Sequence, residues 1–267
     1  MSAPESAQHG CTGGPRAHAE GRRARTARRR RARRPGGLRR AVFRRLFGPR
    51  TSRRKPEGEA GIRSLGHRRY VGGRWEELGR LQFEFLRARG LRPEHLFLDV
   101  ACGALRAGVH LVPWLEPGHY HGIEKEAELV RLGLEEELGP ALRAERAPQL
   151  LVDADFRFDR FGVRFDHALA NSLFTHLPAA MIRTCLQRLR PVMADGGVFH
   201  ASFFEVHRPV RNPATPHDHG DFHYTRGELE ALGAATGWRC EYVGDWGHPR
   251  GQRMMAFHAA PGGVAVP

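Results

Sequence analysis

The sequence predicts an α/β fold, a doubly wound sheet of mostly parallel strands that ends in an antiparallel hairpin. Five short apolar runs alternate with segments of helical periodicity, which is typical of a parallel sheet covered by helices on both faces. A turn of small residues follows the first run. The last two runs are joined by a connection too short for a crossover, so their strands must be antiparallel. The expected strands cover residues 96–100, 119–123, 149–152, 165–170, 196–204, 238–245 and 252–259, and the expected helices cover 70–90, 105–111, 127–138, a segment that opens at Pro178, and 225–236.

The first 60 residues differ from the rest of the chain in composition. Residues 1–60 contain 18 Arg or Lys and four acidic residues, a net charge of +14 that equals the formal charge of the whole chain. They hold too little apolar surface to fold alone, so we expect a disordered tail. Residues 61–267 are neutral, and we expect them to form the folded domain. The tail is therefore the only part with an electrostatic reason to contact nucleic acid or an anionic membrane.

One stretch of the tail has helical periodicity. Leu38, Val42, Leu46 and Phe47 recur at helical spacing among arginines, as in a short cationic helix that lies on an anionic membrane or on RNA. A solvated arm, or an extension upstream of the true start codon, is the simpler interpretation.

Cysteine spacing and hydropathy bear on the compartment. The four cysteines are scattered and form no C-x-x-C pair, so we expect neither a zinc site nor a disulfide framework. The chain has no run of 18 apolar residues, and its twin arginines are not followed by a long apolar segment. We therefore expect a protein of the reducing cytoplasm, without a membrane span or an export signal.

A leading helix is expected ahead of the first strand. Trp75, Leu78, Leu81, Phe85 and Leu86 share one face of residues 70–90, and Gly90 ends the pattern. Such a helix packs its apolar face on the sheet.

The first expected strand is a near-continuous apolar run that suits a strand buried on both faces. It contains Asp99 and leads into the turn Ala101-Cys102-Gly103. In an open parallel sheet this first strand-to-helix turn is where nucleotide-like ligands bind. The next strand ends at Glu124, an acid placed to accept hydrogen bonds from two ribose hydroxyls. The two features predict a cleft for a nucleoside cofactor.

The glycines that a dinucleotide fingerprint needs are missing from residues 101–106. The stretch DVACGALRAG instead resembles the first motif, D-x-G-C-G-x-L-R-x-G, of the class I S-adenosylmethionine-dependent methyltransferases. The resemblance implies S-adenosyl-L-methionine as cofactor and a Rossmann-like seven-stranded sheet in the order 3-2-1-4-5-7-6. It implies that Asp99, Ala101, Cys102, Gly103 and Glu124 bind the cofactor. The family usually has Gly where this chain has Ala101, and the extra methyl group should narrow the turn and reduce cofactor affinity.

The same resemblance implies further cofactor contacts. Arg106 sits where the methionyl carboxylate of the cofactor would lie, and an arginine fork fits a carboxylate; a solvent-facing arginine is the alternative. Asp153 and Asp155 both fit the position that binds the adenine amino group, with a slight preference for Asp155 because Phe156 follows it. Either acid can instead form a turn. Asn171 lies in FDHALANSLFTHLP, which resembles the family's fourth motif beside the transferable methyl group.

The sulfonium methyl of this cofactor is already activated, so the protein mainly aligns the acceptor and excludes water. A hydroxyl acceptor also needs a base. His176, just after the fourth strand, is the first candidate, although it can equally cap backbone groups; His200, Glu205 and His207 are second choices. The working hypothesis is a metal-independent O-methyltransferase for a small-molecule or glycan hydroxyl, with N-methylation left open.

The segment 205–224 holds four histidines and two aspartates but lacks the i, i+4 spacing of common zinc enzymes, so we expect no metal there. We expect this loop to shape the acceptor pocket. Two other classes of protein compete with a methyltransferase. Ala101, Leu105 and the antiparallel ending disfavour a dinucleotide-dependent oxidoreductase. A non-catalytic protein that associates with nucleic acid or membrane through its basic tail is the other alternative.

Overall fold

The computed structural model describes residues 56–259. The expected disordered tail, except its last five residues, and the amphipathic stretch within it lie outside the described residues. The sheet has the strand order β3-β2-β1-β4-β5-β8-β7, and a two-residue strand, β6, pairs with β5 outside this path. With β6 set aside, the order is the predicted one. The fold prediction is therefore confirmed.

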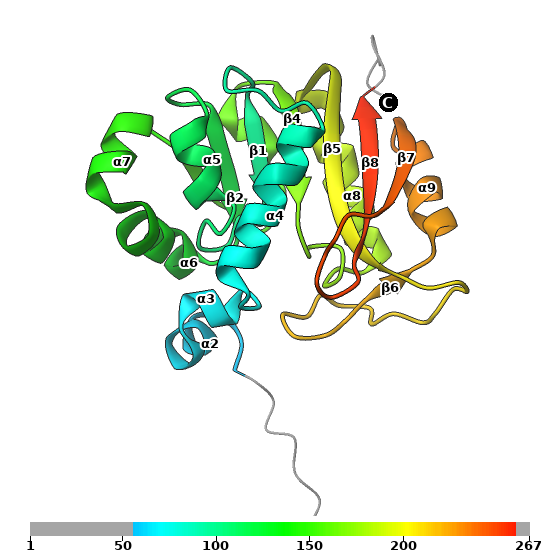
Figure 1. Cartoon of the computed structure of the whole chain (residues 1–267). Coiled ribbons are helices and arrows are strands. Elements are labelled where there is room, and N and C mark those ends of the chain that lie inside the picture. The colour runs from blue at the N-terminus through cyan, green and yellow to red at the C-terminus, as the bar shows by residue number, and fades with distance from the viewer. Residues whose placement is uncertain (1–55, 260–267) are drawn as a thin grey trace, which may run out of the picture. The chain divides into compact units, whose positions relative to one another are not determined.

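The strands agree closely with the apolar runs of the sequence. Neighbouring strands from β3 to β5 are parallel, and the pairs β5–β8 and β7–β8 are antiparallel. The parallel strands therefore end at one edge of the sheet, the lower edge in Figure 1, near α2, α3 and β6. The strands are β1 Phe97–Val100, β2 Tyr120–Glu124, β3 Gln149–Val152, β4 Phe165–Ala170, β5 Met193–Glu205, β6 His223–Tyr224, β7 Trp238–Asp245 and β8 Arg253–Ala259.

Helices cover both faces of the sheet. On one face Leu98 and Val100 of β1 join a buried cluster with residues of α8 and α9. On the other, Phe97 joins a cluster with residues of α4 and α5, which lie on the near side in Figure 1. The helical elements are α2 Gly58–Leu65, α3 His67–Tyr70, α4 Trp75–Ala88, α5 Gly108–Trp114, α6 Ala127–Leu132, η1 Gly133–Leu138, α7 Gly139–Arg146, η2 Phe158–Phe161, α8 Ala179–Leu189, η3 Arg190–Val192 and α9 Arg226–Ala234.

Four helical elements differ from the prediction. The short helices α2 and α3 precede α4 and were not expected, and α2 begins at Gly58, within the last residues of the expected tail. The helix after the first turn begins at Gly108 rather than at residue 105, because Leu105 has a φ of 67° and cannot belong to a right-handed helix. Gly139 breaks the helix that starts at Ala127, as expected, but Pro140 then opens α7 instead of a loop. Among the described residues, no helix is both long and apolar enough to cross a membrane.

Candidate cofactor-binding site

The turn after β1 is bound directly to the end of β2. The backbone N–H of Gly103 donates to Oε2 of Glu124 at 3.0 Å, and that of Cys102 donates to the carbonyl of Ile123 at 3.1 Å. Gly103 has a φ of 57°, and a Cβ there would approach Val71 to 3.0 Å. Glycine is therefore needed at this position for both its conformation and its size.

Glu124 is buried at this edge, as the sequence predicted for the end of the second strand. Its Oε1 accepts the N–H groups of Lys125 and Glu126 at 2.9 and 3.0 Å, in addition to the bond from Gly103 to Oε2. Burial raises the pKa of its carboxyl, while these N–H groups oppose the rise. A carboxylate has about four acceptor positions, so three backbone bonds leave capacity for a ligand hydroxyl.

Asp99 is buried beneath the turn, and its carboxyl is not exposed at the surface. It accepts a hydrogen bond from the hydroxyl of Tyr120 at 2.8 Å, and burial raises its pKa to about 7. Cys102 is also buried, and its Sγ would lie 3.0 Å from a Cβ at Gly122. Both side chains support the turn from below.

Arg106 fastens the turn to the connection between α3 and α4. Its Nη1 donates to the carbonyls of Val71 and Gly73 at 3.0 and 3.3 Å. Its buried Nε has no hydrogen-bond partner among the described residues. Burial lowers the pKa of the guanidinium to about 10, so Arg106 stays charged at neutral pH.

The two acids after β3 have different surroundings. Oδ1 of Asp153 accepts the N–H groups of Asp155 and Arg157 at 2.7 and 3.2 Å, and Oδ2 pairs with the Arg157 side chain. Burial opposes ionisation of Asp153, but these hydrogen bonds prevail and lower its pKa. Asp155 is exposed, and Phe156 after it is buried. Asp153 thus forms the turn, whereas the Asp155 carboxylate is open to solvent.

Asn171 belongs to a polar cluster at the ends of β4 and β5. The hydroxyl of Ser202 bonds to Oε1 of Gln252 at 2.7 Å and lies 3.3 Å from Oδ1 of Asn171. Ser172 donates to the same Gln252 oxygen at 3.1 Å. The buried Nδ2 of Asn171 has no partner within residues 56–259. Ser202 and Gln252 were not predicted as site residues. Their one signal in the sequence is that each is a polar residue within or next to an otherwise apolar strand.

His176 is held in one tautomer by the loop after β5. Its Nδ1 lies 2.9 Å from the carbonyl of Gly220 and 3.1 Å from that of His217. Carbonyl oxygens only accept hydrogen bonds, so Nδ1 carries the proton and Nε2 keeps its lone pair. Burial lowers the pKa of His176, which is therefore neutral at pH 7. This is the protonation state that a general base requires.

The second-choice bases are less well placed. His200 is fully buried, with its ring centroid 5.1 Å from that of Phe85 in α4, so a substrate cannot reach it. Glu205 accepts a hydrogen bond from Tyr242 at 2.6 Å, and His207 is exposed. His176 is the candidate whose surroundings fit the role.

Residues 98–199 match the family model for a methyltransferase domain, a span that contains the turn, Glu124 and His176. This stretch is a methyltransferase domain, and the strand order of the sheet is that of the class I methyltransferase fold. The predicted enzyme class is therefore confirmed, and with it S-adenosylmethionine as the cofactor of that class.

Solved structures share the fold of this methyltransferase at low sequence identity. Magnesium protoporphyrin IX methyltransferase from Synechocystis PCC 6803, with S-adenosylmethionine bound, is 14% identical over 82% of this chain and 96% of its own, with a TM-score of 0.56. The same enzyme with S-adenosylhomocysteine is 13% identical over 82% and 99%, with a TM-score of 0.55. The CcbJ methyltransferase from Streptomyces caelestis is 16% identical over 68% and 89%, with a TM-score of 0.53. No curated protein sequence matches the chain.

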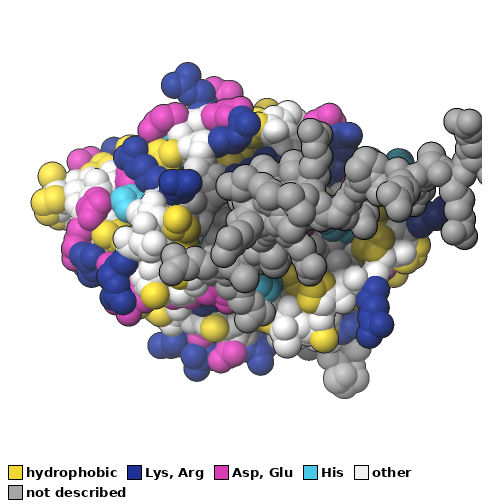
Figure 2. Space-filling model, turned by 90° about the horizontal axis from the view of Figure 1, so that it is seen from below, with side chains coloured by type: hydrophobic (Ala, Val, Ile, Leu, Met, Phe, Trp, Pro, Cys, Tyr) yellow, Lys and Arg dark blue, Asp and Glu magenta, His cyan; other side chains and the backbone are white. Residues whose placement is uncertain are grey.

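The methyltransferase site is bordered by contacts among three segments that are distant in the sequence, which we call the clasp. Asp218 accepts the hydroxyl of Tyr70 at 2.7 Å and the ammonium of Lys125 at 2.6 Å. Burial opposes ionisation of Asp218, but these two donors lower its pKa. The clasp comprises Tyr70, Lys125, His217, Asp218 and His219 together with Pro56, Glu57 and Gly58, which they contact. Figure 2 shows the side of the molecule below the sheet in Figure 1, with basic and acidic side chains interspersed around its rim.

His217, Asp218 and His219 of the loop after β5 are thus engaged in the clasp. Within residues 56–259, no group of three or more His, Cys, Asp or Glu side chains is arranged to hold a metal ion.

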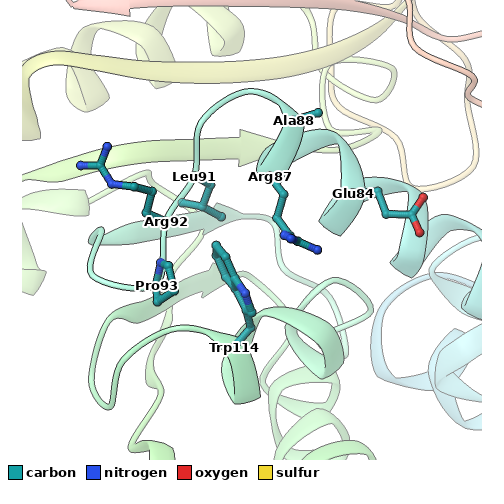
Figure 3. A pocket seen from close by; sticks show the side chains of 7 residues that line it. All are labelled: Glu84, Arg87, Ala88, Leu91, Arg92, Pro93 and Trp114. Atoms are coloured by element: carbon teal, nitrogen blue, oxygen red, sulfur yellow. The ribbon is translucent and has the colours of Figure 1, made fainter.

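A separate depression lies at the other end of the sheet (Figure 3). Residues 91–93, which line it, precede β1, whereas the turn and Glu124 lie at the carboxyl ends of the strands. The guanidinium of Arg87 lies 5.8 Å from the Trp114 ring centroid there. The depression is lined by Glu84, Arg87, Ala88, Leu91, Arg92, Pro93 and Trp114, none of which belongs to the candidate site.

The one departure from the family motif has a testable cost. Ala101 has a φ of 61°, a left-handed conformation that disfavours any residue with a Cβ. We expect Ala101→Gly to raise the free energy of unfolding by about 1 kcal/mol and to lower the Kd for S-adenosylhomocysteine. Thermal unfolding and calorimetric titration measure the two effects.

Ala147→Gly is the matched control, because Ala147 has a φ of 46° and is exposed at the end of α7. It should raise stability without changing cofactor affinity. Equal Kd values for Ala101→Gly and the wild type would show that the extra methyl group does not restrict the site.

Proposed function

We propose that this methyltransferase transfers the methyl group of S-adenosylmethionine to a hydroxyl of a small molecule or a sugar, in the cytoplasm. The observation that carries the proposal is the fixed tautomer of His176, whose unprotonated Nε2 can take the proton of a hydroxyl. N-methylation is the alternative, and an amine that is already neutral would need no such base.

The residues around the turn suit the cofactor. Glu124 would accept a ribose hydroxyl, and the tight turn Ala101-Cys102-Gly103, supported by Asp99, would let the backbone approach. Arg106 would bind the carboxylate through its unpaired Nε, and Asn171 would face the reacting end with its unpaired Nδ2. Asp155, which is exposed, is better suited than Asp153 to bind the adenine amino group. When bound, the cofactor supplies a methyl group already activated by its sulfonium.

The chain's own residues would then align the acceptor and exclude water. The clasp lies at the carboxyl edge of the sheet, and its loop, within residues 205–224, is the segment we assign to the acceptor pocket. A small-molecule acceptor is supported by the name of one structural relative, which refers to magnesium protoporphyrin IX.

Calorimetric titration of the full chain with S-adenosylhomocysteine, and separately with NADH, tests the cofactor. Micromolar binding of the first alone supports the proposal, whereas binding of NADH alone would overturn it. The acceptor is then sought by incubating the chain with methyl-labelled S-adenosylmethionine and a panel of phenols, sugars and amines. Label found only on amines would contradict the hydroxyl.

The basic tail supports a separate proposal. We assign residues 61–267 to the catalytic domain and residues 1–60 to a tail that contacts nucleic acid or an anionic membrane, because the tail carries the whole excess charge. We expect binding of the full chain to RNA or to phosphatidylserine vesicles to weaken steeply with salt and to vanish when residues 1–55, which precede the clasp, are deleted. Binding retained after the deletion would assign the contact to the domain.

A further inference from the structure

Three buried N–H groups near the site have no acceptor among the described residues. They are Nε of Arg106, Nε1 of Trp246 and Nε2 of His248, and these side chains are only 9%, 8% and 5% exposed. Nδ1 of His248 accepts the N–H of Arg250 at 3.2 Å, so a neutral imidazole carries its proton on Nε2. Buried donors in folded proteins are nearly always paired. Three unpaired donors in one region indicate a ligand that supplies acceptor oxygens.

The three groups lie near one another, in positive surroundings. The ring centroids of Trp246 and His248 are 5.3 Å apart. Burial, together with the charges of Arg106, Arg250 and Arg74, lowers the pKa of His248 to about 4. The imidazole is therefore neutral at pH 7 and offers an N–H group without adding charge. Asp99 is the nearby acid, and it already accepts the hydroxyl of Tyr120. An anion is the ligand that this environment favours.

The connection between β7 and β8, residues 246–251, is held firmly enough to form such a site. Trp246 packs against Phe85 of α4 with ring centroids 5.2 Å apart. The guanidinium of Arg250 donates to the carbonyl of Gly72, in the turn that Arg106 also binds. Figure 1 shows this connection beside α4. Arg106 and the connection that carries His248 are thus both hydrogen-bonded to residues 71–73.

We propose that His248, Trp246 and Arg106 form a binding site for a carboxylate. The proposal rests on the proposed function, because the carboxylate would belong either to the amino-acid end of the bound cofactor or to an acidic acceptor. Both present two acceptor oxygens to N–H donors in the same way.

The test compares two variants of His248 that separate the acceptor function of Nδ1 from the donor function of Nε2. His248→Asn keeps an acceptor for Arg250 N–H and loses the distal donor, whereas His248→Gln keeps a distal donor. Calorimetry on the full chain uses S-adenosylhomocysteine and 5′-methylthioadenosine, which lacks the amino-acid end. If the carboxylate is that of the cofactor, His248→Asn should raise the Kd for S-adenosylhomocysteine about tenfold. His248→Gln should bind S-adenosylhomocysteine more tightly than His248→Asn does. The Kd for 5′-methylthioadenosine should not change in either variant.

The second arm uses acetate on the wild type saturated with S-adenosylhomocysteine, with the His248 imidazole followed by ¹H–¹⁵N NMR. A shift of Nε2 that is saturable with acetate, together with unchanged cofactor affinity in His248→Asn, assigns the site to an acidic acceptor. The wild-type spectrum needs no variant to fold. Unchanged cofactor affinity and no acetate shift would overturn the proposal. Failure of the wild type to bind S-adenosylhomocysteine would instead overturn the proposed function, and acetate added to the free chain would still test the anion site.

Discussion

Glu124→Ala should raise the Kd for S-adenosylhomocysteine by about 10- to 100-fold, because the hydrogen bond from a ribose hydroxyl to the remaining acceptor position of the carboxylate is worth about 1.5–3 kcal/mol. The variant also removes the acceptor of three backbone N–H groups, so the turn that Gly103 shares with β2 loses its support. Calorimetric titration of the full chain measures the change.

Two further variants make the Glu124 experiment specific. Glu124→Gln keeps the shape of the side chain, but its amide group would face backbone donors, so we expect nearly the same loss. Glu145→Ala removes an exposed glutamate of α7 and should leave the Kd unchanged. Glu124→Ala binding within threefold of the wild type would exclude this carboxylate from the cofactor site.

His176→Asn should lower kcat by about 10²- to 10⁴-fold, the usual contribution of a general base, while the affinity for S-adenosylhomocysteine stays unchanged. Asparagine can still donate to the carbonyls of Gly220 and His217 from the position of Nδ1, so the loop keeps its anchor. It has no counterpart of Nε2. The assay uses the acceptor that the labelled screen identifies.

The pH profile provides an independent test of His176. Burial lowers its pKa below the ordinary value of 6.5, so the neutral base predominates above that pH and is lost only as the pH falls further. The wild-type rate should therefore be flat from about pH 6.5 upward as far as this group is concerned. His119→Asn, which changes a histidine ahead of β2 at the opposite edge of the sheet, should retain wild-type kcat. An equal kcat for His176→Asn would leave His176 only its structural role.

The sheet was predictable because each strand has a strong local signal. β3, β4 and β7 have the predicted bounds, since apolar runs there are closed by Asp, Asn or Gly. The misplaced start of α5 has a local cause that composition does not reveal. ALRAG is a plausible helix by propensity, yet the positive φ of Leu105 is imposed by the turn that closes onto Glu124.

The residues of the candidate site could be predicted only where they belong to one local sequence motif. Glu124 and Gly103 lie 21 residues apart, and the strand-turn-strand pattern places both at one edge of the sheet, where the structure joins them by a hydrogen bond. Tyr70 and Asp218 are 148 residues apart, and no local pattern links them. His248 and Trp246 belong to a short connection whose role depends on α4 packing beside it. Such residues are brought together by tertiary contacts, which cannot be recognised in a single sequence.

The clasp also has a consequence for the coupling of acceptor and cofactor. Asp218 bonds to Tyr70 and to Lys125, the residue after Glu124, so the N-terminal segment, the acceptor loop and the end of β2 are connected at a single carboxylate. Loss of the Asp218 carboxylate would therefore release all three segments from one another at once. Under the proposed function, the acceptor loop and the end of β2 beside the cofactor are coupled through this one side chain, so that binding of acceptor would affect the placement of the cofactor.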